Sequence, residues 1–363
     1  MRVDRRFWRR ALGSLLLCLS GSAAASGVVE QVSDILATRG LEPPSPQALK
    51  RLADAPIEEA LRDLDPYARL FEAEAYRVPG LEALPSGIGA ELTPAGEHLA
   101  LWPYQGGPAD RAGIIGGSRL VAVDGLKVAG ASPAEVADRL RGAPGSAVEL
   151  TLTTPAKREQ RVRLLRADFQ PLDVESHIEH GRQLLRIRRF RAGLTRPAVA
   201  ARLAAYRAQA VKRPLVLDLR FSGGGDVFEA LDVAGLFLDA GQALVSFVGR
   251  AGEPERFTNR RAGDTRTPLS IWVGPDTASA AEVLAAILRY HERAELRGEP
   301  TRGKCSIQTD VPLRNGAVLR FTEKRVLLPD GSSCDGEPLQ PDRPLPVAEE
   351  GDERQDHQPG ETA

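Results

Sequence analysis

The stretch LSIWVGPDTASAAEVLAAILRYH, residues 269–291, decides the fold class. It begins with a short apolar run that ends at Gly274-Pro275, which predicts a buried strand. A helix is expected from about Ser279 to His291, because Ser279 is a favoured cap residue and Glu282 follows it at the spacing of a capping box. A strand joined by a short turn to a helix is the building unit of a layered α/β domain.

Residues 169–345 continue this alternation, and we assign them to one domain. Short apolar runs alternate with helical stretches of about 10 to 15 residues, which implies crossover connections between strands of one sheet. Helices are expected over 196–212 and from the glycines at 223–225 to about 238. Strands are expected over 215–217, 244–248, 294–297, 307–311 and 317–328.

Residues 85–168 predict a compact, strand-rich domain. Apolar and other residues alternate over 88–92 and 148–152, as in half-buried strands. Asp124-Gly125 follows an apolar run and favours a tight hairpin. The segment 132–135, Ser-Pro-Ala-Glu, has the cap, the proline and the glutamate of a helix start.

The two ends of the chain differ from its body. Residues 1–25 combine a basic start, an apolar run and a small-residue site, as in a secretory signal, and the run is too short to span a bilayer. An uncleaved anchor is the alternative. Residues 28–80 predict an N-terminal helical segment, and residues 346–363 predict a polar, disordered tail. We therefore expect an exported protein, periplasmic or extracellular.

Charge excludes some classes of partner. The chain has a net charge of −1, and removal of residues 1–25, with five Arg and one Asp, lowers it to −5. Such a protein has no electrostatic reason to bind nucleic acid or anionic lipid. No later stretch reaches the roughly 18 apolar residues of a membrane span. We expect no span after signal cleavage.

Cys305 and Cys334 are the two cysteines beyond the signal segment. Exported thiols meet an oxidising compartment, so a disulfide between them is one reading, and two buried free thiols are the other. Neither cysteine has a CxxC partner or a nearby histidine, so we expect no metal site. No motif calls for a cofactor.

Ser279 stands where the predicted strand gives way to the predicted helix. Its hydroxyl would be exposed at the end of the sheet. The free N–H of Ala280 and the helix dipole would favour negative charge beside it, as a tetrahedral oxyanion requires. Ser279 and Glu282 also suit a simple helix cap, and the segment alone leaves that role open.

Lys304 is one of few lysines in an arginine-rich chain, and it lies where a loop enters a predicted strand. As a base it would have to be neutral near pH 7, which requires burial to lower its pKa from about 10.4. Gln308 lies four residues on and, by the period of a strand, on the same face, where it could orient the amine. A solvated loop lysine is the alternative.

Together these motifs resemble the C-terminal processing (tail-specific) peptidases, S41-type serine peptidases with a PDZ domain. Residues 276–282 are similar to the nucleophile motif of that family, and residues 303–308 to its lysine motif. Phe221, Ser222 and Gly223 depart from the family's usual Asn-Asn-Pro. Further similar motifs, in the family's order, are Leu64–Tyr67, Gly87–Ala90, Pro108–Ile114, Val123–Gly125, Asp218–Gly225, Pro329–Gly331 and Pro341-Asp342.

The resemblance implies a fold and a set of roles. The fold would be a layered, ClpP/crotonase-like α/β peptidase domain with a β-rich PDZ domain and the small N-terminal helical segment. Ser279 would attack the peptide carbonyl, Lys304 would take its proton, and Gln308 would orient the lysine. The N–H groups of Ala280 and Gly224 would form the oxyanion hole. The PDZ residues implied in peptide binding are Gly87, Ile88, Gly89 and Ala90.

We therefore expect a serine endopeptidase that binds C-terminal tails of exported proteins through its PDZ domain and cleaves peptide bonds with a Ser–Lys dyad. An adaptor protein is left open as a further partner. The alternative is a catalytically silent PDZ-bearing scaffold that binds C-terminal peptides. A lost Ser279, Lys304 or Gln308 would favour it, and all three are present. A Ser–Lys amidase would need an SxxK motif, which Ser279 lacks.

Overall fold

The computed structural model describes residues 27–76, 86–179, 181–250 and 252–345. The expected signal segment and the expected C-terminal tail lie outside these ranges. Within them, no helix combines the length and the apolar character that crossing a bilayer would require.

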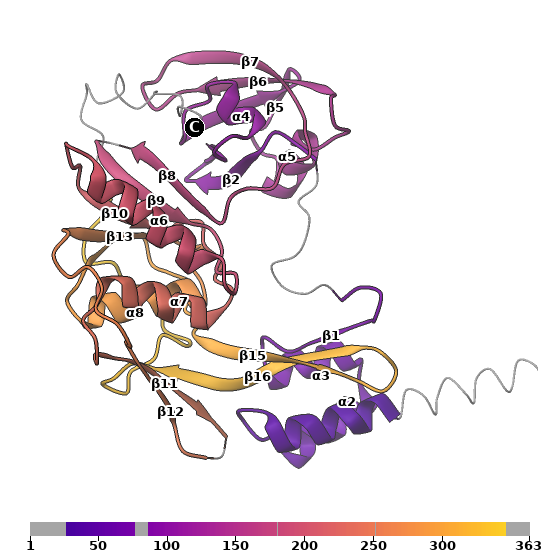
Figure 1. Ribbon diagram of the computed structural model, residues 1–363. Helices are drawn as coiled ribbons and strands as arrows, with labels where there is room; N and C mark the ends of the chain where they lie inside the picture. The colour runs from indigo at the N-terminus through magenta and orange to yellow at the C-terminus, as the bar shows by residue number, and fades with distance from the viewer. Residues whose placement is uncertain (1–26, 77–85, 180, 251, 346–363) are drawn as a thin grey trace, which may run out of the picture. The chain divides into compact units, whose positions relative to one another are not determined.

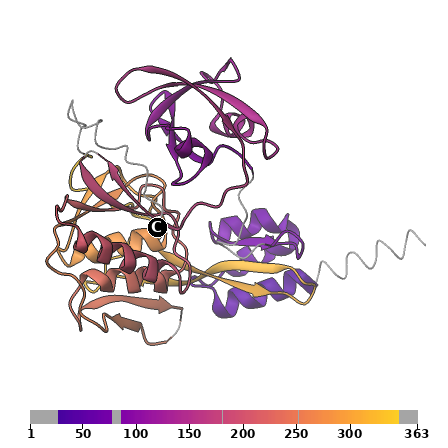
Figure 2. The same cartoon turned by 45° about the horizontal axis from the view of Figure 1, so that its top comes forward.

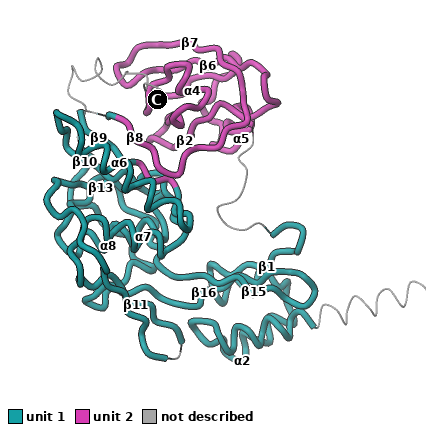
Figure 3. Tube along the Cα trace, viewed as in Figure 1, with its two compact units in different colours: residues 1–78, 178–185, 189–363 teal, residues 79–177, 186–188 magenta. Residues whose placement is uncertain are grey.

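The chain divides into two compact units, which Figure 3 colours separately. Unit 1 consists of residues 1–78, 178–185 and 189–363, and unit 2 consists of residues 79–177 and 186–188. The stretch in which we expected a strand-rich domain, 85–168, falls in unit 2.

One sheet has the strand order β14-β13-β10-β9-β8. The pairs β10–β13 and β13–β14 are parallel, as crossover connections require. Strand β13 covers the residues expected from the sequence, and β10 is buried along its whole length. The bounds are β8 Val174–Glu179, β9 Arg182–Ile187, β10 Leu215–Asp218, β13 Leu269–Val273 and β14 Glu295–Gly298.

A second sheet has the order β1-β16-β11-β12, with β15 paired to the other edge of β16. In Figures 1 and 2 the helices α6, α7 and α8 lie between the two sheets. This confirms a layered α/β arrangement. The bounds are α6 Thr195–Ala208, α7 Val227–Ala234, α8 Ala280–Tyr290, β1 Arg69–Phe71, β11 Ala243–Gly249, β12 Glu255–Thr258, β15 Ser306–Pro312 and β16 Val318–Leu327.

The N-terminal segment is helical over residues 27–39, α2 (Pro46–Asp54) and α3 (Ile57–Leu64). These helices bury apolar side chains against the β15–β16 hairpin, in one core cluster that includes Phe321. The expectation of a helical segment over residues 28–80 was wrong at residues 69–71. Residues 69–71 form strand β1, because pairing with β16 outweighs the local helical spacing of apolar residues.

Unit 2 contains a sheet of order β2-β3-β4-β6-β7, with β5 paired to β4. Asp124 and Gly125 both have positive φ, 48° and 77°, and form the expected hairpin turn. Ser132 and Glu135 form the expected capping box at the start of α5. The bounds are β2 Ala90–Ala95, β3 His98–Pro103, α4 Pro108–Arg111, β4 Ser118–Val123, β5 Leu126–Lys127, α5 Pro133–Leu140, β6 Ala147–Thr153 and β7 Glu159–Leu165.

Candidate active site

The loops that follow β10 and β13 are held together at the carboxyl ends of these parallel strands. Thr277 Oγ accepts from Gly274 N and donates to Leu219 O, both at 2.9 Å. Ala278 N donates to Ser222 O at 3.0 Å. Such an edge is where open α/β sheets place their ligand sites.

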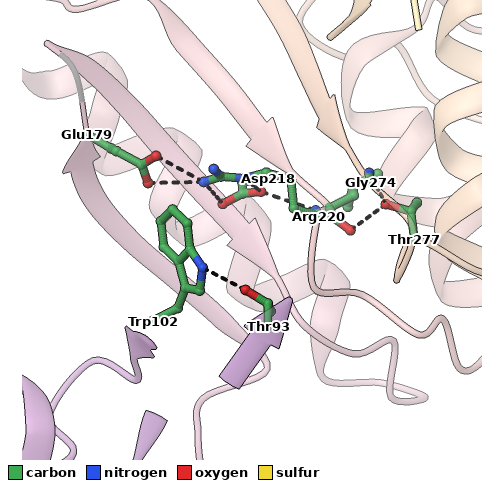
Figure 4. A network of polar contacts seen from close by, with 8 residues as sticks. Thr93, Trp102, Glu179, Asp218, Arg220, Gly274 and Thr277 are labelled. Atoms are coloured by element: carbon green, nitrogen blue, oxygen red, sulfur yellow. Dashed lines mark hydrogen bonds and ion pairs between the residues drawn. The ribbon is translucent and has the colours of Figure 1, made fainter. Parts of the chain in front are cut away.

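An ion-pair network supports the first of these loops (Figure 4). The Arg220 guanidinium bonds both carboxylate oxygens of Asp218 and both of Glu179, at 2.8 to 3.2 Å. These two carboxylates raise the pKa of Arg220 against the opposing effect of burial. Its guanidinium also lies 4.6 Å from the centre of the Trp272 ring. The Asp-Leu-Arg motif therefore fixes the loop that leads to the glycines at 223–225.

Ser279 precedes the first residue of α8 and is half-buried. Its backbone has φ 57° and ψ −125°, a conformation that non-glycine residues rarely adopt and that costs about 1–3 kcal/mol. Such strain persists where the surroundings fix it, and it concentrates at functional sites. The N–H of Ala280 is the first of the helix and has no partner within the helix.

Gly224 approaches this turn closely. Its φ is 93°, and a Cβ built on it would lie 2.6 Å from Ala278 O, 2.8 Å from Ser279 Cβ and 2.9 Å from Ala280 N. Only glycine fits there without a shift of the backbone. The backbone of residue 224 therefore lies beside Ala280 N at the start of α8.

Glu282 joins the start of α8 to the loop that contains Lys304. Its side chain is fully buried. Oε2 accepts from Ser279 N at 3.0 Å and from Lys304 N at 2.8 Å. Oε1 accepts from Gly303 N at 2.7 Å and from Thr301 Oγ at 2.5 Å. We had interpreted Glu282 only as part of a helix cap, and no pattern in the sequence points to its bonds with the distant loop.

Lys304 is half-buried. Burial lowers the pKa of its ammonium below the ordinary 10.5, and the positive charges of Arg320 and Arg302 lower it further. Asp65 and Asp335 act in the opposite direction. The net direction is the one that a lysine base needs.

Tyr67 and Asp65 lie near the lysine. The Lys304 Nζ is 4.9 Å from the centre of the Tyr67 ring. Asp65 accepts from Thr322 N at 2.6 Å, which ties the end of α3 to β16. The sequence predicted no role for their motif, Leu64–Tyr67, beyond its resemblance to the family motif, and this contact gives it a structural reason.

Gln308 forms hydrogen bonds with Ser306, whereas a contact with Lys304 was expected. Its amide donates to Ser306 O at 3.2 Å and to Ser306 Oγ at 3.1 Å. Among the hydrogen bonds of the described residues, none joins Gln308 to Lys304. Strand β15 begins at Ser306, so Lys304 precedes it and the period of two on which we based a common face does not extend to the lysine. Its role in orienting Lys304 stays a prediction.

Cys305 and Cys334 form a disulfide, and the alternative of two buried free thiols does not apply. Their Cα atoms are 5.2 Å apart, and 29 residues separate them in sequence. Cys305 follows Lys304 directly, and its N–H donates to Asp335 Oδ1 at 3.2 Å. The disulfide and this bond therefore anchor the lysine loop to the segment after β16.

The expected peptide-binding residues of unit 2 lie before and at the start of β2. Gly87 pairs with Ala167, Gly89 has φ 66°, and Ile88 is 3% exposed. Ala90 begins β2, which is the terminal strand of its sheet. A terminal strand offers the edge to which an extended peptide can add.

Comparison with known proteins gives two matches within the chain. Residues 183–345 match peptidase family S41, and residues 100–154 match the PDZ domain. A protein of Staphylococcus haemolyticus strain JCSC1435, named "Probable CtpA-like serine protease", is 28% identical over 298 residues, 80% of this chain and 60% of that protein. A protein of the same name from Staphylococcus aureus strain bovine RF122 / ET3-1 is 29% identical over 302 residues, 82% and 60% of the two. The chain thus spans about 60% of the length of these relatives.

Two solved structures are similar. The photosystem II D1 C-terminal processing protease aligns with a TM-score of 0.56 and 27% identity, over 87% of this chain and 92% of that one. A Bacteroides fragilis NCTC 9343 protein assigned to the S41 proteases aligns with a TM-score of 0.60 over 87% and 90%, but at 15% identity it supports the fold alone. These matches confirm the resemblance seen in the sequence: the chain is similar to S41-type serine peptidases of the C-terminal processing kind over residues 183–345, and to PDZ domains over residues 100–154.

Proposed function

We propose that this protein is a serine endopeptidase in which Ser279 is the nucleophile and Lys304 is the general base. The observation that carries the proposal is the bonding of Glu282, whose one oxygen accepts from the backbone N–H groups of both residues. Burial of a charge is unfavourable unless hydrogen bonds compensate for the lost water. The fully buried carboxylate of Glu282 therefore depends on its bonds to these two loops, and it holds the loops together. The strained backbone of Ser279 and the lowered pKa of Lys304 point the same way.

The proposed reaction conserves protons at each step. Neutral Lys304 takes the hydroxyl proton of Ser279 as Oγ attacks the peptide carbonyl. The N–H groups of Ala280 and Gly224 bind the oxyanion that forms. Lys304 then gives its proton to the leaving amine, and water hydrolyses the acyl-enzyme by the same route. Gln308 acts as a positioning residue through its bonds to Ser306, two residues after the lysine.

We also propose that the PDZ domain binds C-terminal tails of protein substrates by strand addition near Gly87–Ala90, and that these substrates are exported proteins. Support comes from the terminal position of β2 in its sheet and from the signal-like pattern of residues 1–25. The disulfide near Lys304 suits an oxidising compartment. An adaptor that delivers substrates is compatible with this scheme and is not required by it.

The test is degradation of a folded protein with an apolar C-terminal tail, beside the same protein with a charged tail. Residues 26–363 would be compared with Ser279→Ala and Lys304→Ala variants of matched thermal stability. We expect tail-dependent degradation by the unchanged chain and none by either variant. No degradation by any of the three, together with tail-dependent binding by all, would establish the scaffold instead.

A further inference from the structure

A pocket of about 150 Å³ lies in unit 1, beside the candidate base. It is bounded by the turn after the first helix, the end of α3 and the β15–β16 hairpin. Its walls are mainly apolar and include Leu36, Leu41, Pro44, Leu64 and the ring of Tyr67. A hollow of about this volume with apolar walls can take up a molecule the size of benzene.

Several polar groups of the pocket are engaged in its walls, and Glu42 and Arg325, which also line it, bond to each other at 3.4 Å. Asp65 accepts from Tyr67 N at 2.9 Å and from the N–H and hydroxyl of Thr322 at 2.6 and 3.1 Å. Asp335 accepts from Cys305 N at 3.2 Å. These carboxylates therefore hold the walls in place, and the surface offered to a ligand is mostly hydrocarbon.

Two residues that line the pocket lie close to Lys304, which is not itself among the lining residues. Tyr67 forms one wall, and the centre of its ring is 4.9 Å from Lys304 Nζ. Ser306 forms another wall and lies two residues after the lysine. A side chain held in the pocket would thus place its own backbone close to the candidate base.

The neighbouring strand supplies an edge for an extended chain. Strand β15 begins at Ser306 and pairs with β16 along one edge. Among the described strands, none pairs with its other edge. An added peptide strand would point alternate side chains to one face, so one side chain near the reacting bond could enter the pocket.

We propose that this pocket is the specificity subsite of the peptidase and takes one apolar side chain, of leucine to phenylalanine size, next to the scissile bond. The inference rests on the proposed function and adds the substrate preference of the same site. Leu41 is the residue to change, because its side chain lines the pocket and is only partly buried. Val211 serves as a matched control, because it is 75% exposed and lies elsewhere in unit 1.

The experiment uses unstructured fluorogenic peptides. Mass spectrometry first locates the bond that residues 26–363 cut, and Ala, Leu or Phe is then placed at each flanking position. At one position we expect kcat/KM for Leu or Phe to exceed that for Ala by about tenfold or more. Leu41→Trp, which fills the pocket, should remove most of this ratio, and Leu41→Ala should move the preference from Leu toward Phe. Val211→Trp should keep the ratio.

A second readout separates this inference from the proposed function. Fluorescein-labelled Leu and Ala peptides are titrated into the Ser279→Ala protein with and without Leu41→Trp. Tighter binding of the Leu peptide, lost with Leu41→Trp, supports the subsite even if no peptide is cut, in which case only the proposed function fails. An unchanged Leu-to-Ala ratio in folded Leu41→Trp, in cleavage and in binding, overturns the subsite while leaving the peptidase assignment intact.

Discussion

Each of the two units contains a buried charged side chain that bonds to several backbone groups, with a carboxylate in one unit and a guanidinium in the other. In unit 1, the Glu282 carboxylate accepts from the N–H groups of residues 279, 303 and 304. In unit 2, the Arg166 guanidinium donates to the carbonyls of residues 139, 140 and 147. Helix starts leave N–H groups unpaired and helix ends leave carbonyls, so each charge suits the end that it meets.

Glu282 and Arg166 differ in the segments to which their backbone partners belong. The partners of Glu282 include the candidate nucleophile and the candidate base, so its loss would disturb the reacting groups themselves. The partners of Arg166 lie at the end of α5 and the start of β6, and its side chain also packs against Gly142, whose N–H donates to Ser86 O. Its loss would disturb the loop that leads to the expected peptide-binding residues. We therefore expect Glu282 to affect bond cleavage and Arg166 to affect tail binding.

Glu282→Gln should give the largest effect. The amide replaces one acceptor oxygen with a donor among four converging donors, so residues 279 and 304 both shift. We expect about 10³-fold lower kcat/KM on every peptide, since a 1 Å misplacement of one group costs about 10²-fold. Thermal unfolding should show a loss of about 3–5 kcal/mol. Glu59→Gln, at an exposed residue, is the control. Near-normal activity of Glu282→Gln would show that this carboxylate does not position residues 279 and 304.

Gly224→Ala should come next. The new Cβ would meet Ala278 O and Ser279 Cβ, so the backbone of residue 224 must move away from Ala280 N. Loss of one oxyanion donor costs about 10²–10³-fold in kcat. Steady-state kinetics should show this fall mainly in kcat, with KM little changed. Gly223→Ala, whose Cβ meets nothing within 4 Å, is the matched control.

A smaller effect is expected from the double substitution Cys305→Ser and Cys334→Ser. A disulfide with this sequence separation contributes about 3–4 kcal/mol in the chain-entropy estimate. The lysine loop keeps its bonds to Glu282, so activity at low temperature should fall less than tenfold. Mild reduction of the unchanged protein should lower activity and stability to a similar extent. Calorimetry and peptide cleavage check both parts. Unchanged activity and unfolding temperature after reduction would contradict a role for the disulfide.

Arg166→Gln should leave cleavage of short peptides within about twofold, while degradation of tail-bearing proteins falls. Carbonyls at the end of α5 would lose buried donors, each worth about 1–3 kcal/mol. Calorimetry should show the loss in the unfolding of unit 2. Arg163→Gln, which is exposed on β7, serves as the control. If Arg166→Gln lost equal activity on short peptides and on tail-bearing proteins, Arg166 would not act on tail binding alone.

Local patterns predicted much of this molecule. The limits of β13 and α8, the Asp124-Gly125 turn and the Ser132 cap follow from short-range preferences, and the structure agrees with each. The prediction failed at residues 69–71, where pairing with β16 decides the structure. The long-range bonds of Glu282 could not be predicted either, because nothing local connects residue 282 to residues 301–304. The start of β15 at Ser306, after Lys304, likewise depends on its pairing with β16.

The most direct test of the account is the pH dependence of Ser279 phosphonylation by a fluorophosphonate. Because the pKa of Lys304 is lowered, the labelling rate should rise with pH along a titration curve whose midpoint lies below 10.5. The rate should level off above that midpoint. Labelling should map to Ser279 and should fall by at least about 10²-fold in Lys304→Ala. Equal labelling rates in the unchanged and Lys304→Ala proteins across this range would contradict the Ser–Lys assignment.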